Sequence, residues 1–327
     1  MLLTRTPYRI SLFGGGSDHP VWYRENGGEV ISFAINKYCY LATKVIPLDF
    51  GAQYQISYSN FERTNSLEEI KHPVVREAIR RYCPDIRLQI IHDSDLPARS
   101  GIGSSSAFAV GLIQSLTTLI ERDLSVSELA EEAIHLEQHI LKETVGSQDQ
   151  IACAFGGFNY ITFGKEPDWT LLPMEMPEQQ IREIERRVVL VFTGVTRNSS
   201  DVQMGLLSNI KSNYRIMNRN IDLARECKRI FINQGNMDEV GDLLLESWHI
   251  KRELNPLSVN LELQEIWDKG IEAGALGGKV LGAGGGGFCM FWVRDGGREE
   301  FLQKFSIGTV VPIKVSMEGS TCIVKSL

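Results

Sequence analysis

The chain has 327 residues, of which 43% are hydrophobic and 23% are charged, fractions typical of a folded protein and not of a disordered one. Its 34 Lys and Arg residues against 41 Asp and Glu residues leave a formal net charge of −7. Like charges form no long block, so the sequence argues against a protein that binds nucleic acid or an acidic membrane and favours a small-molecule partner.

Chain length and cysteine usage lead to further expectations. One hydrophobic core rarely serves so long a chain, so we expect two domains, and a homodimer is left open. The six cysteines form no CxxC pair, which predicts reduced core thiols in place of a zinc site or a disulfide framework. No apolar run is long enough for a signal or membrane helix, so we expect a cytoplasmic protein without membrane contact.

The first 100 residues are predicted to be rich in strands. β-branched and aromatic residues predict strands over 28–35, 38–46, 52–59 and 86–92. The pattern of 67–82, between the last two strands, predicts a helix.

Two further helices are predicted after the serine run. Apolar residues occupy most faces of 107–122, as in a helix buried inside a domain. A second helix is expected over 125–141, with Ser127 as its N-cap and acidic residues in its first turn.

Three prolines among polar residues, within 165–177, indicate a connection between domains. We therefore expect domains at 1–167 and 168–327. Beyond the connection, strands are predicted over 186–195, 287–293 and 309–317, with several helices over 201–274. Strands and helices mix without regular alternation, so the α+β class is expected in place of a doubly wound sheet.

The stretch LPARSGIGSSSAF lies between a predicted strand and the buried helix. Gly101 and Gly103 allow successive amides to point into one concavity, and the unpaired amides of the helix's first turn add positive potential. Serine hydroxyls in the same turn can bind phosphate or a hard cation. The purely structural alternative is a flexible loop that caps a helix. A GxxxxGK[ST] phosphate loop is absent.

A second glycine-rich run, KVLGAGGGGFCMFWV, spans 279–293. It contains GxGxxG, but a helix is expected before the glycines and a strand after them, the reverse of a dinucleotide-binding fingerprint. Such a density of glycine favours a backbone that closely approaches a ligand.

A third element, TPYRISLFGGGSDHP, is a short strand that ends in three glycines and an acidic residue. In order and spacing, PYRISLFGGGSD, LPARSGIGSSSAF and KVLGAGGGGF resemble the three signature motifs of the GHMP kinases, named for galactokinase, homoserine kinase, mevalonate kinase and phosphomevalonate kinase. The resemblance implies a kinase that uses ATP and Mg²⁺. It also implies a left-handed βαβ crossover in the N-terminal domain, a ferredoxin-like C-terminal domain and an active site between them.

Within the family, RTPYRISLFGGGSDHP, YRENGGEVISFAINKYCY and GSQDQIACAFGGFN most resemble sugar kinases that phosphorylate the anomeric hydroxyl of D-glycero-D-manno-heptose 7-phosphate. Gly15 and Gly16 stand where galactokinase carries a glutamate and a histidine, which argues against galactose. Another sugar or a mevalonate-like alcohol is the enzymatic alternative. A sensor that binds ATP and sugar without turnover is the alternative from another class.

The resemblance assigns two catalytic residues. Asp149 aligns with the family's catalytic aspartate, which accepts or orients the proton of the sugar hydroxyl. Arg9 aligns with an arginine that lowers the pKa of that hydroxyl and steadies charge on the phosphoryl group. The alternatives are a helix cap for Asp149 and a structural salt bridge for Arg9.

The resemblance also implies a magnesium site made by Glu137 and Ser105, whose oxygens suit that ion. Glu143 is the rival for Glu137. His135 and His139 flank Glu137 at a helical spacing, but Leu136 occupies the place where the zinc-protease motif needs its glutamate, so zinc is disfavoured.

The remaining assignments concern ATP and the sugar. The ATP phosphates are assigned to Pro97, Ser100, Gly101, Ile102, Gly103, Ser104, Ser105 and Ser106. The sugar is assigned to Gly15, Gly16, Ser17, Asp18, Arg197, Gly284 and Gly285, with a loop-capping role as the alternative for Asp18. A phosphorylated sugar needs a cation at its far end, for which the candidates are Arg197, Lys37 and Arg99.

Overall fold

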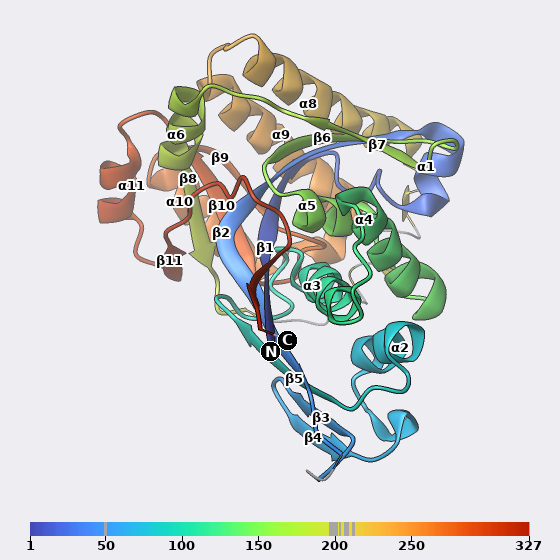
Figure 1. Cartoon of the computed structure of the whole chain (residues 1–327). Coiled ribbons are helices and arrows are strands. Elements are labelled where there is room, and N and C mark those ends of the chain that lie inside the picture. Colours follow the sequence, from blue (N-terminus) through green and yellow to red (C-terminus); the bar gives the residue numbers. More distant parts are fainter. Residues whose placement is uncertain (49–50, 196–201, 203, 206–208, 211–212, 327) are drawn as a thin grey trace.

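The protein is built from two β-sheets with helices packed against them (Figure 1). The computed structural model describes residues 1–48, 51–195, 202, 204–205, 209–210 and 213–326. The predicted α+β class is confirmed, because both halves mix strands and helices and most strand pairs are antiparallel.

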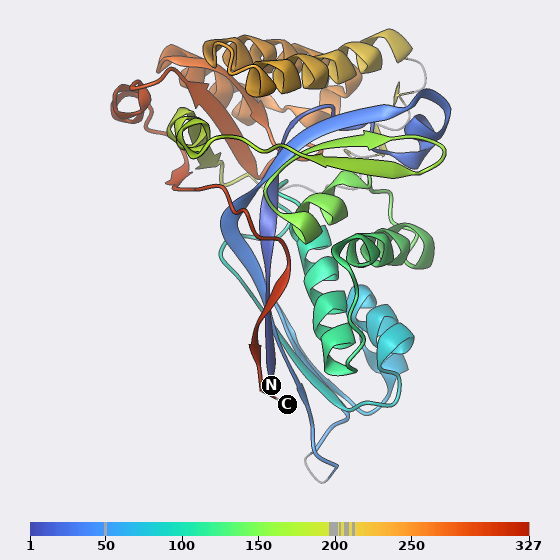
Figure 2. The ribbon, with the colours of Figure 1, turned by 45° about the horizontal axis from the view of Figure 1, so that its top comes forward.

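The larger sheet has eight described strands. They are β1 (Leu2–Phe13), β2 (Gly28–Val45), β3 (Tyr54–Ser57), β4 (Phe61–Thr64), β5 (Leu88–Ser94), β6 (Phe158–Phe163), β7 (Trp169–Pro173) and β12 (Thr321–Lys325). The order is β12-β1-β2-β5-β3-β4, with β6 paired to β2 and β7 to β6. Leu2 lies opposite Lys325, so the beginning and the end of the chain lie side by side (Figure 2).

Strand β2 is one strand of 18 residues, so the prediction of two strands over 28–35 and 38–46 is wrong. The break that the sequence suggested is a β-bulge. Tyr8 pairs with Ile35 and Pro7 with Tyr38, so Asn36 and Lys37 are extra residues that the strand accommodates without ending.

Helices cover one face of the larger sheet (Figure 2). They are α2 (Pro73–Tyr82), α3 (Ser104–Leu119), α4 (Val126–His135) and α5 (Gln148–Phe155), and α1 (Pro20–Asn26) follows β1. Helices α3 and α5 pack on β1 and β2, and α2 and α4 pack on α3. Most residues of α3 are buried, which confirms the prediction of an internal helix.

The N-cap of α4 is Ser125, and the prediction of Ser127 is wrong. The Ser125 hydroxyl accepts a hydrogen bond from the Glu128 amide at 3.2 Å, and the Glu128 carboxylate accepts one from the Ser125 amide at 2.7 Å. This reciprocal capping box satisfies two amides, whereas Ser127 has no acidic or amide side chain three residues later.

The smaller sheet has the order β11-β8-β10-β9 and is antiparallel throughout. Its strands are β8 (Val188–Phe192), β9 (Ala275–Val280), β10 (Phe288–Val293) and β11 (Thr309–Val311), and the helices around it are α6 (Glu178–Arg187), α8 (Tyr214–Ile232), α9 (Asp238–Leu254), α10 (Leu261–Glu272) and α11 (Arg298–Lys304). If these four strands are numbered in chain order, their order across the sheet is 4-1-3-2, which is the ferredoxin-like arrangement. In the larger sheet β3 and β5 form the parallel pair, and the left-handed sense of their crossover stays a prediction.

The connection expected over 165–177 contains strand β7, which pairs with β6 of the larger sheet. The predicted boundary after residue 167 therefore falls in the turn of a hairpin, and β12 returns to the same sheet from the end of the chain. The main hydrophobic core is also shared, since Phe158 of β6 contacts Phe231 of α8 with ring centroids 5.9 Å apart. The two domains predicted from the sequence thus share one sheet and one core.

The strand predicted over 309–317 is shorter in the structure, because Pro312 follows β11 and cannot donate to the sheet. All six cysteines are free, and five are buried, as predicted for core thiols. Of the helices that the structure describes, none combines the length and apolar character that crossing a membrane requires.

Candidate active site

A cavity of about 1080 Å³ is lined by residues from both sides of the predicted domain boundary. Its walls are the loop after β1, the loop before α3, the start of α5, one face of α9 and the loop after β9. The three glycine-rich motifs, more than 70 residues apart in sequence, therefore meet at one cavity. A hollow of about 600 Å³ beside α8 lies elsewhere, and its Arg225 is paired with Glu29 and Asp222.

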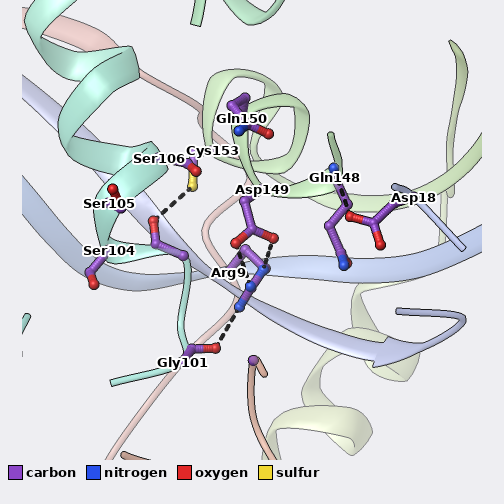
Figure 3. A network of polar contacts seen from close by, with 12 residues as sticks. Arg9, Asp18, Gly101, Ser104, Ser105, Ser106, Gln148, Asp149, Gln150 and Cys153 are labelled. Carbon is purple, nitrogen blue, oxygen red and sulfur yellow. Dashed lines mark hydrogen bonds and ion pairs between the residues drawn. The ribbon is translucent and has the colours of Figure 1, made fainter. Parts of the chain in front are cut away.

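Arg9 and Asp149 form a bidentate ion pair in this cavity (Figure 3). The Nε and Nη2 atoms of Arg9 donate to the two carboxylate oxygens of Asp149 at 2.7 and 2.6 Å, and Nη1 donates to the Gly101 carbonyl at 2.8 Å. Burial opposes the charge of Arg9, but the Asp149 charge and hydrogen bonds outweigh it and raise the pKa of the guanidinium. The two predicted catalytic residues are thus in direct contact.

Their places in the fold explain the pairing. Arg9 lies within β1 and is only 3% exposed, so it needs an anionic partner nearby. Asp149 lies in the first turn of α5, where the helix dipole favours a carboxylate. Helix α5 begins at Gln148, and the Asp149 side chain binds Arg9 in place of a backbone amide. The alternative role of a helix cap therefore has no support in these contacts.

The serine loop joins β5 to α3, as predicted, and is shaped by backbone with positive φ at Arg99, Gly101 and Gly103. Gly103 is the N-cap of α3, and no side chain caps the helix. The first-turn amides, which have no partner within the helix, therefore stay available for an anion beside the cavity. Of the predicted ATP-binding residues, Gly101, Gly103, Ser104, Ser105 and Ser106 line the cavity, whereas Pro97, Ser100 and Ile102 are not among its lining residues.

The serine loop and the glycine-rich run after β9 pack on each other. A Cβ on Gly101 would lie 2.5 Å from the Leu281 carbonyl oxygen, and a Cβ on Gly282 would lie 2.6 Å from the Gly101 Cα. The amide of Phe288 also donates to the Ser100 carbonyl at 3.1 Å. Part of the density of glycine after β9 thus serves a close approach of backbone to backbone. Gly282, Gly284 and Gly286 also line the cavity, so the approach of this run to a ligand stays a prediction.

The predicted sugar-binding glycines after β9 are placed differently. Gly284 lines the cavity, while Gly285 is not among the lining residues and its amide donates to the Ser258 carbonyl at 2.7 Å.

In the loop after β1, Gly15, Gly16 and Asp18 line the cavity. The Asp18 carboxylate accepts hydrogen bonds from the amides of Gly16 at 2.8 Å and Gln148 at 3.3 Å, so its contacts are those of the loop-capping alternative. Ser17 is fully buried, and its hydroxyl donates to the carbonyls of Gly14 and Glu29. The structure therefore does not bring Ser17 to the cavity.

Glu137 lies on a π-helical turn after α4 and is completely buried. Its carboxylate accepts hydrogen bonds from Ser105 at 3.2 Å, Ser106 at 2.8 Å and Gln150 at 2.5 Å. Burial raises the pKa of Glu137 to about 7. The contact with Ser105 joins a hydroxyl and a carboxylate oxygen, which fits Mg²⁺, and a divalent cation beside the carboxylate would favour its charged form.

The rival Glu143 lines the cavity, and burial raises its pKa as well. Its amide donates to the Glu137 carbonyl at 2.8 Å, so both carboxylates belong to one region. The rings of His135 and His139 lie 5.3 Å apart, but the described residues contain no group of three or more side chains suited to a metal.

Arg197 lies outside the described residues, so its assignment to the sugar stays a prediction. Of the other two candidates for a distal phosphate, Arg99 lines the cavity beside the serine loop, and Lys37 is not among the lining residues.

The sequence reasoning missed four aromatic rings that line the cavity, contributed by Tyr58, His72, His92 and Phe108. The centroid of His72 lies 4.8 Å from that of Tyr58 and 4.9 Å from that of Phe108, and His92 lies 5.0 Å from Phe108. Burial lowers the pKa of both histidines, which favours their neutral, aromatic form. These rings come from four separate segments and share no local sequence signal.

Two polar atoms beside Asp149 were also missed. The Ser11 hydroxyl and the Gln148 side-chain oxygen are buried, line the cavity, and have no hydrogen-bond partner within the described part of the chain. Both residues lie close to Gly15, where a Cβ would be 3.6 Å from Ser11 Oγ and 3.5 Å from Gln148 Nε2. Unpaired buried acceptors and donors of this kind can form hydrogen bonds with a polar ligand.

Comparison with known proteins agrees with this geometry. Residues 70–157 match the model of the GHMP kinases N terminal domain, and residues 210–307 match that of the GHMP kinases C terminal domain. The chain is 29% identical over 305 residues to a D-glycero-alpha-D-manno-heptose 7-phosphate kinase of Campylobacter jejuni. The matched region covers 89% of this chain and 88% of that protein.

Solved structures show the same fold. The crystal structure of a D-glycero-D-manno-heptose 1-phosphate kinase from Bacteroides thetaiotaomicron superposes with a TM-score of 0.83 and 25% identity over the full length of both chains. Lactococcus lactis galactokinase complexed with galactose superposes with a TM-score of 0.73 and 17% identity, covering 98% of this chain and 94% of that one, which shows the fold alone.

Proposed function

Since the chain belongs to the GHMP kinase family, we propose that this ATP-dependent sugar kinase phosphorylates the anomeric hydroxyl of D-glycero-D-manno-heptose 7-phosphate. The relative from C. jejuni, which shares most of its length with this chain, carries that substrate in its name. The B. thetaiotaomicron structure is named for a heptose 1-phosphate, so both similar proteins support a heptose phosphate.

The observation that carries the proposal is the Arg9–Asp149 pair beside the serine loop. A sugar hydroxyl beside Asp149 would find a carboxylate to accept or orient its proton. Arg9, held by the same carboxylate, supplies positive charge where negative charge develops on the transferred group. Arg9 also binds the Gly101 carbonyl, which couples the acceptor side of the cavity to the phosphate loop.

The phosphates of ATP would bind at the start of α3. The first-turn amides and the hydroxyl of Ser104 offer neutral donors to their negative charge, while the hydroxyls of Ser105 and Ser106 donate to Glu137. Family members generally use Mg²⁺, which neutralises phosphate charge, and Ser105 and Glu137 would hold it here. The aromatic rings of Tyr58, His72 and Phe108, which line the cavity close to one another, suit a stacked purine base.

The sugar would bind between the loop after β1 and the start of α5. Gly15 and Gly16 leave room there that larger side chains would fill. The unpaired Ser11 hydroxyl and Gln148 carboxamide can hydrogen-bond the hydroxyls of a sugar. A sensor without turnover has no need of a carboxylate paired with a buried arginine, so the contact of Arg9 with Asp149 argues against that alternative.

The proposal is tested by measuring ADP release with MgATP over a panel of sugars and sugar phosphates. The panel includes heptose 7-phosphate, heptose 1-phosphate, unphosphorylated heptose, fucose, galactose and mevalonate. We expect the highest kcat/KM for heptose 7-phosphate and a product phosphorylated at the anomeric oxygen. Higher kcat/KM for an unphosphorylated sugar or for mevalonate would refute the substrate and leave the kinase activity intact.

A further inference from the structure

Two lysines line the cavity at the point where the three glycine-rich motifs meet. Lys279 of β9 is 8% exposed and donates a hydrogen bond to the Leu12 carbonyl, at the end of β1, at 2.7 Å. Lys251 of α9 donates to the carbonyls of Val280 at 2.8 Å and Gly282 at 2.6 Å. Lys279 therefore adjoins the loop that holds the acceptor, and Lys251 holds the glycine run that packs on Gly101.

The alternation of β9 explains how a lysine reaches this place. Val280 belongs to the core between the smaller sheet and its outer helices. Neighbouring side chains of a strand face opposite sides, so Lys279 lies on the side of the larger sheet. An apolar side chain could be buried at this position without a desolvation cost, whereas the chain has a lysine here.

The charges around these lysines are unbalanced. Neither lysine forms an ion pair with a carboxylate among the described residues. Lys251 and Arg9 act on Lys279, and Cys289 and Arg9 act on Lys251, while the carboxylate of Asp149 is already held by Arg9. A buried ammonium without an anion is costly, so an anionic ligand in this cavity would remove a real electrostatic penalty.

The hydrogen-bonding capacity of Lys279 is also incomplete. An ammonium has three N–H donors, and the structure gives Lys279 one acceptor. Two donors therefore remain at the wall of the cavity. Lys251 has two acceptors, both in the glycine run, which indicates a positioning role for that residue.

We propose that Lys279 is a second cationic ligand-binding residue of this kinase, which binds a phosphate group at the junction of the serine loop and the loop after β1. Lys251 acts through the glycine run and keeps it against Gly101. This inference rests on the proposed function for the position of ATP and sugar, but it requires only a phosphate group and not the heptose.

Two phosphate groups enter the cavity under the proposed function, namely the transferred phosphoryl group of ATP and the phosphate of the acceptor. Both present the same oxygens to an ammonium, so geometry alone does not choose between them. Burial lowers the pKa of Lys279 and brings the pKa of Lys251 to about 7, and a bound phosphate would raise both.

The test compares wild type with Lys279→Met and Lys279→Arg by isothermal titration calorimetry at pH 8. The probes are MgADP, the magnesium complex of the β,γ-imido analogue of ATP, and heptose 7-phosphate. We expect Lys279→Met to bind one of the last two about 10- to 100-fold more weakly and MgADP within about threefold. Weaker binding of the imido analogue would assign Lys279 to the transferred group, and weaker binding of the sugar phosphate would assign it to the acceptor.

Lys279→Arg keeps a charge and should recover part of the lost affinity, which a purely structural role would not predict. Lys304→Met is the matched control, because that lysine lies on α11, is more than half exposed and pairs with Glu300. Equal affinity of wild type and Lys279→Met for all three probes would overturn the proposal. If Lys279→Met does not fold, Lys279→Gln replaces it, because its amide keeps a donor for the Leu12 carbonyl and removes the charge; equal affinity of wild type and Lys279→Gln for all three probes would overturn the proposal.

Discussion

Replacing Asp149 by Asn keeps the shape of the side chain and removes the charge that faces Arg9. Arg9 is 3% exposed and gives Asp149 two hydrogen bonds, at 2.7 and 2.6 Å. Breaking a fully buried ion pair costs about 3 to 5 kcal/mol. A quarter of the Asp149 side chain is exposed, and the Asn oxygen still accepts one bond, so we expect about 1 to 3 kcal/mol. The corresponding fall in Tm is roughly 1 to 5 °C for a chain of 327 residues.

The effect on catalysis should be larger than the effect on stability. A positioned general base contributes about 10²- to 10⁴-fold to the rate, and an amide cannot accept the proton of the sugar hydroxyl. We therefore expect kcat of Asp149→Asn to fall by about that factor. Affinity for MgADP should stay within about threefold, because the amides at the start of α3 are unchanged.

The assay is ADP release at saturating MgATP and sugar phosphate, with MgADP affinity from calorimetry and Tm from thermal unfolding. Asp295→Asn is the matched control, since Asp295 forms an exposed ion pair with Arg186 and should change neither kcat nor Tm measurably. A kcat within tenfold of wild type would refute the role of Asp149 in the chemical step. Loss of MgADP binding in a folded variant would show that the residue is structural.

Three further changes test other parts of the site. Ser105→Ala removes the hydroxyl 3.2 Å from Glu137, so the Mg²⁺ concentration for half-maximal activity should rise several-fold in a metal titration; an unchanged requirement would exclude Ser105 as a ligand. Burial raises the pKa of Glu137 to about 7, so the folded protein binds more protons than the unfolded chain and stability falls as pH rises from about 4 through about 7. In metal-free buffer, we therefore expect the free energy of unfolding, measured with urea, to fall between pH 5 and pH 8 by about 2 kcal/mol less for Glu137→Gln than for wild type. An equal fall in the two proteins would contradict the buried, protonated state. Gln148→Leu removes an unpaired carboxamide, so the KM for the sugar should rise about tenfold while the KM for ATP is unchanged; the reverse pattern would move Gln148 to the nucleotide.

Features that depend on a few neighbouring residues could be predicted from the sequence. The turn from β5 into α3 needs positive φ at Gly101 and Gly103, and this requirement is visible in the order of glycines and serines. The buried character of α3 is visible in its apolar residues on most faces. Local propensity was less useful where tertiary pairing overrides it, as in β2, which continues through Asn36 and Lys37 as a bulge.

The Arg9–Asp149 pair shows what a sequence resemblance adds to local patterns. Arg9 and Asp149 were assigned separately, by alignment with family motifs, and the structure joins them over 140 residues of chain. The same reasoning placed Ser17 on the sugar, but the Ser17 hydroxyl is satisfied by backbone carbonyls and Ser17 is not among the residues that line the cavity. A hydroxyl in a glycine loop can turn to either side, and only the packing of the loop against Glu29 decides which.

By itself, the sequence determined the chemistry available to this protein: three glycine-rich motifs, a carboxylate after one of them and an arginine within another. Only the tertiary structure decided that Gly101 packs on Leu281, that Lys279 reaches Leu12, and that rings from four segments line one cavity. Backbone conformation and helix capping depend on neighbouring residues and can therefore be seen in the sequence. The partner of a buried side chain depends on which distant segments pack together, and that is a property of the whole fold.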